Sequence, residues 1–503
     1  MTRRQRLTLV AAILGSAVAT IDGSIVNVAL PAIARDLGGG LVSQQWVSNA
    51  YLLTLGSLIL VGGSLGDIYG ERRIFALGVG AFGLFSLASA LAPSIGLLIA
   101  ARALQGASAA LLTPASLAII VGAFSQSERG AAIGAWTAWG GIASIIGPLA
   151  GGVVVDQASW RWIFALNIPL VAATLALIFA AVPPSVPVRG RRVDLVGAGL
   201  GALGLAGCVF GLIEEPRYGW SSWVIVAPLV TGVVSFVAFL AYERRAPQPM
   251  LELDLFKRRN FAVGNLETLA MYAGLAILFF FLTIFLQQVA GYSALRSGLA
   301  TVPVTIVVFA LSRRFGALAD KIGPRRLMGA GPLIAAAGIF LLLRLGSAIS
   351  YATDVLPAML LFALGLSITV APLTATVLAG ADESDAGIAS AINNAVARVA
   401  GLIGVSAVGV AIAGELPAGT FGHNGASVAA FHHAILICGV LVAAGGIVGL
   451  LGIVDPKRSV DATRCAGGQL VGAPGPAVDP QPRSPQPRVT APAYPAKSST
   501  GAA

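Results

Sequence analysis

Fourteen long apolar runs dominate this sequence and constrain its fold more than any other feature. A helix needs about 20 apolar residues to cross the roughly 30 Å hydrocarbon core of a bilayer. On that rule, spans are predicted at 8–31, 44–66, 74–92, 95–118, 130–155, 161–183, 195–214, 222–242, 261–287, 294–312, 326–345, 355–379, 386–413 and 428–454. The sequence therefore predicts an all-α integral membrane protein with 14 transmembrane helices.

Composition agrees with a membrane protein. Of 503 residues, 56% are hydrophobic and only 11% are charged, whereas a soluble domain carries about 25% charged residues. The net charge of +10 comes from short basic clusters between the runs, a pattern typical of membrane topology and not of nucleic-acid binding. The three cysteines lack the spacing of metal or redox sites, so we expect neither a metal site nor a disulfide.

Lysine and arginine predict the orientation. With the N-terminus inside, the segments on the inner side hold 25 of the 32 Lys and Arg residues. Such an excess marks the cytoplasmic side. We therefore expect a multi-pass protein of the cell (inner or plasma) membrane with both termini in the cytoplasm. The apolar run after the N-terminal arginines is too long for a signal peptide and is interpreted as the first span.

An internal repeat predicts two equivalent halves. Residues 63–73 (GSLGDIYGERR) recur as residues 316–326 (GALADKIGPRR), each copy on the inner side after the second span of a six-helix set. The predicted domains are an N-terminal half at 8–183, an inserted two-helix hairpin at 195–242 and a C-terminal half at 261–454. Residues 456–503 hold nine prolines and are expected to form a disordered cytoplasmic tail.

The repeated segments are candidate gating loops. An Asp at a helix N-terminus gains about 0.3–1 kcal/mol from the helix dipole, and neighbouring arginines can bridge to it. Such contacts would break when the inner side opens. The alternative, that the arginines only set topology, leaves the Gly and Asp positions unexplained. The candidates are Gly63, Asp67, Gly70, Arg72, Arg73, Asp320, Gly323, Arg325 and Arg326.

The repeat resembles the signature loop of the major facilitator superfamily. Further stretches resemble its 14-helix drug:proton antiporters, the QacA/EmrB-like group. These stretches are IDGSIVNVALP at 21–31, RALQG at 102–106, GPLAGG at 147–152, WRWIFALNIP at 160–169 and SAINN at 390–394. The resemblance implies a two-half bundle with a central cavity that exports apolar or cationic compounds in exchange for protons. Span 294–312 lacks the acid that some dication exporters carry, so a dication preference is not carried over.

Asp22 is the leading candidate for proton coupling. A carboxylate at depth in the membrane costs about 2.5–3.5 kcal/mol on insertion scales and is by default a functional candidate. Arg102, at a matching depth on the fourth span, is its expected partner, and Asn27 of the same motif is included as a substrate-site candidate. The alternatives are a hydrogen-bonding residue that supports the motif, and a static ion pair between the first and fourth spans.

Other candidates carry less specific signals. Glu267 could be a second proton or cation site, or could reach the inner interface, and Arg398 is a further deep charge whose partner the sequence does not choose. The expected hinge or seal lies at Gly147, Pro148, Gly151 and Gly152, because Pro and Gly permit kinks and close packing.

The predicted function is proton-coupled export of small compounds such as drugs, antibiotics or dyes. We expect a monomer in the bilayer that takes a small-molecule substrate and protons, binds no nucleic acid and needs no cofactor besides the proton gradient. There is no phosphate-binding loop of the ATPase type. The alternative is an exporter of one endogenous metabolite, lipid or siderophore. A membrane-embedded enzyme would need clustered catalytic groups, and no catalytic residue is predicted.

Overall fold

The computed structural model describes residues 1–184, 193–247, 249–380 and 386–455. Residues 1–455 form one compact unit. The tail predicted at 456–503 and the basic cluster at 189–192 lie outside the described residues.

The prediction of 14 apolar spans is confirmed: 14 helices of the described residues are long and apolar enough to cross a membrane. Short helical segments α6, η2, η3 and η4 continue four of these spans, and η1 and η5 lie between spans. The helices are α1 (Arg3–Leu37), α2 (Leu41–Tyr69), α3 (Glu71–Ala90), α4 (Ile95–Ala123), α5 (Gln126–Gln157), α6 (Arg161–Ala165), α7 (Asn167–Ala181), α8 (Leu195–Tyr218), α9 (Trp223–Glu243), η1 (Leu253–Lys257), α10 (Arg259–Ile284), η2 (Phe285–Val289), α11 (Ala294–Ile322), α12 (Pro324–Leu341), η3 (Leu342–Arg344), η4 (Tyr351–Val355), α13 (Leu356–Ala379), α14 (Ala386–Ala413), η5 (Pro417–Gly419) and α15 (Gly425–Gly452).

Several helices run beyond their apolar segments. The predicted end of the tenth span at residue 312 is wrong, because α11 continues to Ile322 and ends only at Gly323. Apolar length reports the hydrocarbon crossing, whereas a helix continues into water until a residue interrupts it. Similarly, α1 begins at Arg3, where Thr2 and Gln5 form a reciprocal capping box.

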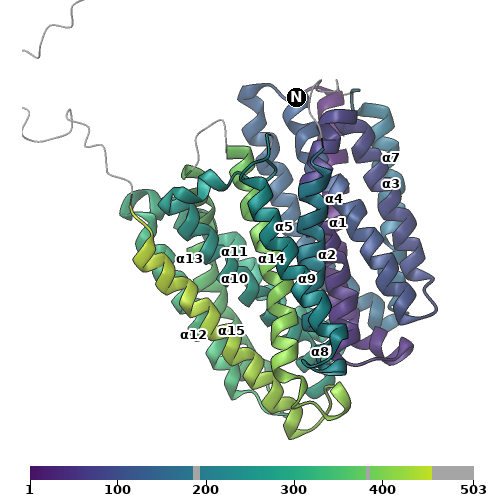
Figure 1. Ribbon diagram of the computed structural model, residues 1–503, viewed down its shortest axis with the longest axis vertical. Helices are drawn as coiled ribbons and strands as arrows, with labels where there is room; N and C mark the ends of the chain where they lie inside the picture. The colour runs from purple at the N-terminus through teal and green to yellow at the C-terminus, as the bar shows by residue number, and fades with distance from the viewer. Residues whose placement is uncertain (185–192, 248, 381–385, 456–503) are drawn as a thin grey trace, which may run out of the picture. The chain divides into compact units, whose positions relative to one another are not determined.

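The helices form two sets within residues 1–455. Figure 1 shows the purple and blue helices α1–α7 on one side and the green and yellow helices α10–α15 on the other. The two-half helical bundle predicted from the repeat is thus the observed fold. The exact domain boundaries stay a prediction.

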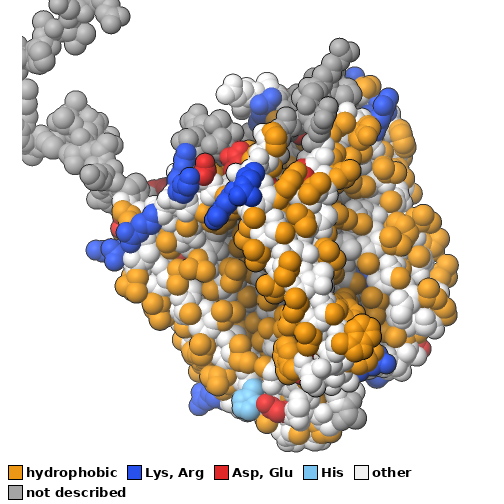
Figure 2. All heavy atoms as spheres, in the orientation of Figure 1, with side chains coloured by type: hydrophobic (Ala, Val, Ile, Leu, Met, Phe, Trp, Pro, Cys, Tyr) orange, Lys and Arg blue, Asp and Glu red, His pale blue; other side chains and the backbone are white. Residues whose placement is uncertain are grey.

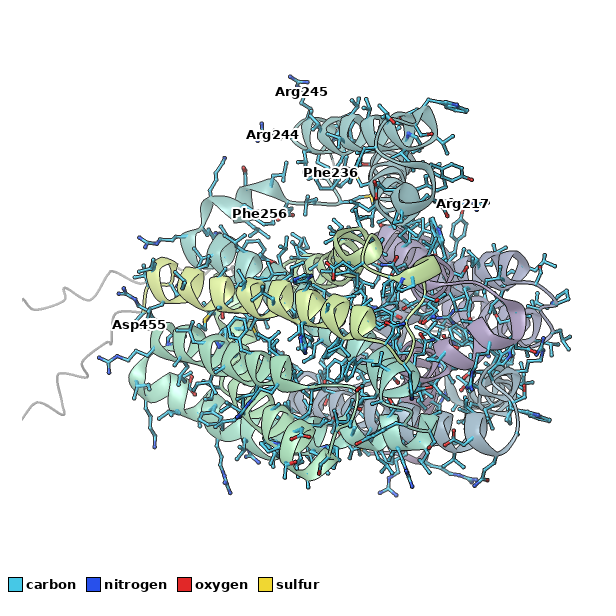
Figure 3. All side chains as sticks on the ribbon, turned by 90° about the horizontal axis from the view of Figure 1, so that it is seen from below. Arg217, Phe236, Arg244, Arg245, Phe256 and Asp455 are labelled. Carbon is cyan, nitrogen blue, oxygen red and sulfur yellow. The ribbon has the colours of Figure 1, made fainter. Side chains whose placement is uncertain are left out.

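The hairpin of α8 and α9 is a separate pair of tightly packed helices. A Cβ added at Gly207 would lie 2.3 Å from the Pro228 carbonyl oxygen and 2.8 Å from the Gly232 Cα, so only glycine permits this contact. Trp46 Nε1 of α2 donates to the Glu214 carboxylate of α8 at 2.7 Å, which ties the hairpin to the N-terminal set. Figure 3 shows Arg217 at one end of the hairpin, and Arg244 and Arg245 at the other.

The outer surface of the bundle suits a lipid environment. Large apolar side chains are exposed along the hairpin, including Trp223 at 78% and Val234 at 62%. Figure 2 shows a broad hydrophobic surface between the two ends of the visible face, with most of its Lys and Arg at the end that holds the N-terminus. Aliphatic exposure of this extent fits helices that face hydrocarbon rather than water.

Candidate functional site

The structure brings Asp22 and Arg102 together inside the N-terminal half. Arg102 Nη1 forms a salt bridge to Asp22 Oδ2, and the two side chains are 1% and 0% exposed. The second carboxylate oxygen accepts hydrogen bonds from Gln105 Nε2 at 2.9 Å and Asn167 Nδ2 at 3.0 Å. Both amides also donate to Ser86 Oγ, at 2.7 and 2.8 Å. The carboxylate is therefore fully satisfied in this conformation.

Helix α4 supplies two of these groups because Arg102 and Gln105 are three residues apart and share a face. Gln105 and Asn167 belong to the motifs at 102–106 and 160–169, but the sequence analysis predicts no role for either residue. Ser86 of α3 was missed, and nothing in the local sequence distinguishes it from other membrane serines. It becomes identifiable only when three helices place it against the two amides.

Tyr51 of α2 links this cluster to the open interior. The Arg102 guanidinium lies 4.4 Å from the centroid of the Tyr51 ring and 5.6 Å from that of Phe164. Such cation–π contacts stabilise a desolvated guanidinium. Tyr51 also lines the central cavity, whereas Asp22 and Arg102 are not among its lining residues. The ion pair therefore sits one side chain behind the cavity wall.

The central cavity has a volume of about 650 Å³ and lies between the two halves. Hydroxyl and amide groups from α1, α4, α5, α10, α11 and α14 line it, among them Ser16, Thr20, Asn27, Thr113, Thr137 and Thr301. Arg398 of α14 is the lining residue with a full charge, and no Asp or Glu of the described residues lines the cavity. Its size falls in the range of small-molecule sites, about 300–1,000 Å³.

Hydrogen bonds bridge the two halves at the end of the bundle opposite the N-terminus. Gln45 Nε2 of α2 donates to the Val405 carbonyl oxygen at 2.7 Å, and Asn49 Nδ2 donates to Ser406 Oγ at 3.0 Å. Nearby, the Gln287 amide donates to the Val28 carbonyl oxygen at 2.9 Å. These contacts close that end in the observed conformation.

The candidate hinge on α5 packs against both halves. A Cβ at Gly147 would lie 2.0 Å from Ser24 Oγ, and one at Gly151 would lie 2.4 Å from Ile25 Cγ1, both on α1. A Cβ at Gly152 would lie 2.5 Å from Leu295 Cα on α11. Pro148 stays within the helix. The glycines thus allow α5 to approach α1 and α11 closely, while a hinge role stays a prediction.

The structure corrects the physical account of the gating loops. Asp67 and Asp320 lie near the C-terminal ends of α2 and α11, not at helix N-termini. Neither carboxylate is therefore stabilised by the dipole of the helix on which it lies. Gly70 and Gly323 adopt φ values of 90° and 88° between successive helices, a conformation that favours glycine. Gly63, the remaining glycine among the gating-loop candidates, lies within α2. A Cβ added there would lie 3.8 Å from Pro114 Cβ, so the packing leaves room for a side chain.

The arginines of the two loops make different contacts. Arg72 Nη2 donates to the Phe179 carbonyl oxygen at 3.3 Å. In the second copy, Arg325 Nε donates to the Leu450 carbonyl oxygen at 2.6 Å, and its backbone N–H donates to Asp455 at 2.9 Å. Arg73 and Arg326 are exposed. Each loop is therefore anchored to the last helix of its own half.

Glu267 lies away from the central cavity. It is 0% exposed, and neither carboxyl oxygen has a hydrogen-bond partner among the described residues. A Cβ at Gly449 would lie 2.4 Å from Glu267 Oε2 and 2.7 Å from the Met328 carbonyl oxygen, so the carboxyl is packed between α10, α12 and α15. In the described ranges, no group of three or more His, Cys, Asp or Glu residues could hold a metal ion.

The family model of the Major Facilitator Superfamily matches residues 12–405. The chain belongs to this superfamily. A puromycin resistance protein, pur8, of Streptomyces alboniger is 39% identical over 396 residues, which cover 77% of this chain and 77% of that protein. A multidrug resistance protein, Stp, of Mycobacterium tuberculosis is 35% identical over 419 residues, which cover 83% of this chain and 78% of that protein.

Solved structures of the superfamily share the fold. The inward-open xylose transporter XylE from E. coli matches with a TM-score of 0.59 at 14% sequence identity, covering 90% of this chain and 97% of that chain. This likeness shows the fold, whereas the family model and the relatives confirm the resemblance to the major facilitator superfamily. The protein is a multi-pass membrane transporter of small molecules and not an enzyme.

Proposed function

We propose that this superfamily member is a proton-coupled antiporter that exports antibiotic-like small molecules. The relatives support export, because they include resistance proteins and a cephamycin export protein, CmcT, of Amycolatopsis lactamdurans. The single observation that supports proton coupling is the buried Asp22–Arg102 pair directly behind the cavity wall. A buried ion pair whose acid can be neutralised is a natural two-state element.

The coupling follows from the charges around Asp22. A proton on the carboxyl removes the attraction that holds the Arg102 guanidinium, and the neutral acid then needs fewer donors. Movement of Arg102 then alters its contact with Tyr51, whose ring centroid lies 4.4 Å from the guanidinium. Since Tyr51 lines the cavity, protonation behind the wall changes the shape of the substrate site in front of it.

The proposed orientation places both termini in the cytoplasm. Lys and Arg concentrate at the end that carries the N-terminus, as expected for the inner side. The hydrogen-bonded end would then face outward, so the conformation suits substrate loading from inside. The proton gradient is the proposed energy source, with no cofactor, and one charge that crosses 100 mV contributes about 2.3 kcal/mol.

Antibiotic-induced proton release in everted membrane vesicles tests the proposal. Vesicles are acidified inside, and a pH-sensitive dye reports proton release when each member of an antibiotic panel is added. We expect release from wild-type vesicles and none from Asp22→Asn vesicles. Asp36→Asn is the matched control, because Asp36 lies on the same helix but pairs with Arg161 at the exposed end.

Two results would contradict the proposal in different ways. If Asp22→Asn supports normal proton release, Asp22 is not the coupling site. If no panel member releases protons from wild-type vesicles, the drug-export reading fails. The narrow exporter of one endogenous product then becomes the better reading.

A further inference from the structure

We infer that this exporter selects substrates that carry an acidic group, such as a carboxylate or a phenolate, through Arg398. The inference deepens the proposed export function and rests on it for the direction of transport. It concerns the chemical class of the compound in the central cavity. It differs from the apolar or cationic compounds that the family resemblance implies.

Among the described residues, Arg398 has no acidic partner. It lies near the middle of α14, and its Nε donates to Asn394 Oδ1, one turn earlier, at 3.1 Å. Within the described part of the chain, the terminal guanidinium nitrogens have neither a salt bridge nor a hydrogen bond to protein. An arginine at the centre of a membrane helix is costly to bury in hydrocarbon, so it faces a cavity or a partner.

The guanidinium stands where two cavities meet. It lines the central cavity of about 650 Å³ and an adjoining one of about 370 Å³. Asn27, Asn394 and Phe279 line both cavities as well. The smaller cavity also reaches Ser48 and Asn49 of α2, beside the hydrogen bonds that close that end of the bundle. A ligand held by Arg398 would thus lie between the open interior and the closed end.

The two fully buried acids of the described residues, Asp22 and Glu267, do not balance this charge. Asp22 is occupied by Arg102, Gln105 and Asn167. Glu267 is packed against Gly449, and neither acid lines either cavity. Hence the cavity carries net positive potential, which low-dielectric walls focus onto a bound ligand. A cationic ligand would meet a like charge there, which disfavours its binding.

The neighbouring groups define the rest of the ligand. A guanidinium presents N–H groups in a planar fork that fits a carboxylate with two hydrogen bonds. Asn394 is a positioning residue, because its amide oxygen fixes one edge of that fork. Phe279 and Tyr272 offer aromatic surface, while Asn27 offers amide hydrogen bonding. The arrangement fits an aromatic or alicyclic acid with additional hydroxyl or carbonyl groups.

Binding of a matched ligand set to the purified protein tests the inference. We would titrate 1-hydroxy-2-naphthoate, its methyl ester and its cationic aminoethyl amide by calorimetry. The three compounds share one ring system and differ in charge. Charge-assisted hydrogen bonds contribute about 1.5–3 kcal/mol, so we expect the acid to bind about 10- to 100-fold more tightly than the ester.

Variants of Arg398 assign the preference to this side chain. We expect Arg398→Gln to abolish the preference for the acid and Arg398→Lys to retain only part of it, since Lys keeps the charge but loses the fork. Arg161→Gln removes a guanidinium that pairs with Asp36 and lines neither cavity, so it serves as the control, with the preference retained. If Arg398→Gln does not fold, the ratio of the acid and ester affinities of the wild-type protein still tests whether the cavity prefers an acid.

Two outcomes would overturn the inference: an amide cation that binds more tightly than the acid, or an Arg398→Gln protein that keeps the acid preference. Failure of the proposed function is distinguishable from both. In that case the purified protein prefers the acid, yet no compound releases protons from acidified vesicles. Conversely, proton release by cations alone would support the exporter and overturn the acid-selective site.

Discussion

The carboxylate of Asp156 caps a helix of the opposite half of the protein, at Ala294. Asp156 lies in the last turn of α5, and its two oxygens accept hydrogen bonds from the backbone N–H groups of Ala294 and Leu295, each at 2.9 Å. The first N–H groups of a helix have no acceptor within that helix. Asp156 therefore satisfies donors of α11 and places negative charge at its positive end.

Replacing Asp156 by Asn should loosen the closed end of the bundle. The change removes the negative charge of the acceptor. Hydrogen bonds to a charged group contribute about 1.5–3 kcal/mol, and a negative charge at a helix N-terminus also interacts favourably with the helix dipole. We expect at least about tenfold faster labelling of a Ser297→Cys reporter by an impermeant maleimide from outside, in a protein without its native cysteines. Ser297 lines the cavity and is 1% exposed. Asp36→Asn should leave the labelling rate unchanged, and equal rates in both variants would refute the capping role.

Gly152→Ala should open the same end by a steric route. The added Cβ would lie 2.5 Å from Leu295 Cα and 3.0 Å from the Ala294 carbonyl oxygen, so α5 and α11 must separate. Overpacking of this kind costs about 1–3 kcal/mol. Gly140→Ala is the matched control on α5, because nothing lies within 4 Å of its Cβ. Labelling of the Ser297→Cys reporter should rise for the first variant only; an equal rise in both would show general loosening of α5.

Arg102→Met should destabilise the protein strongly. It leaves Asp22 buried without its charge partner, and breaking a buried ion pair costs about 3–5 kcal/mol. The double variant Asp22→Asn/Arg102→Met removes both charges, so we expect it to recover most of the free energy of unfolding without recovering proton release. Thermal unfolding in detergent measures the first effect, and the vesicle assay measures the second. A double variant no more stable than Arg102→Met would contradict this account.

Glu267→Met should stabilise the protein or leave its stability unchanged. Both carboxyl oxygens are buried without partners among the described residues, and removing an unsatisfied polar group gains about 1–3 kcal/mol. Glu214→Met is the comparison. Glu214 accepts a hydrogen bond of 2.7 Å from Trp46, so we expect the Glu214→Met protein to be less stable than the wild type. We expect proton release to persist in Glu267→Met. Its loss in a stably folded protein would show instead that Glu267 titrates during transport.

The acid at a helix N-terminus shows how sequence reasoning and structure diverge. The repeat made Asp67 and Asp320 the expected acids at helix starts, yet both lie near helix ends. Asp156 has that role instead, for a helix 138 residues away in the chain. Local spacing predicts which residues share a helix, but it contains no information about which helix of the other half lies opposite.

The sequence by itself determined the membrane class, the number of spans, the two-half organisation and the depth of Asp22 and Arg102. These features follow from apolar length, basic clusters and repetition, which act locally along the chain. Only the tertiary structure decided that Gln105, Asn167 and Ser86 enclose Asp22, that Glu267 faces α15, and that Arg398 faces the cavity without an acid. Such pairings arise from how separate helices rotate and pack against one another, and no short segment of sequence encodes that rotation.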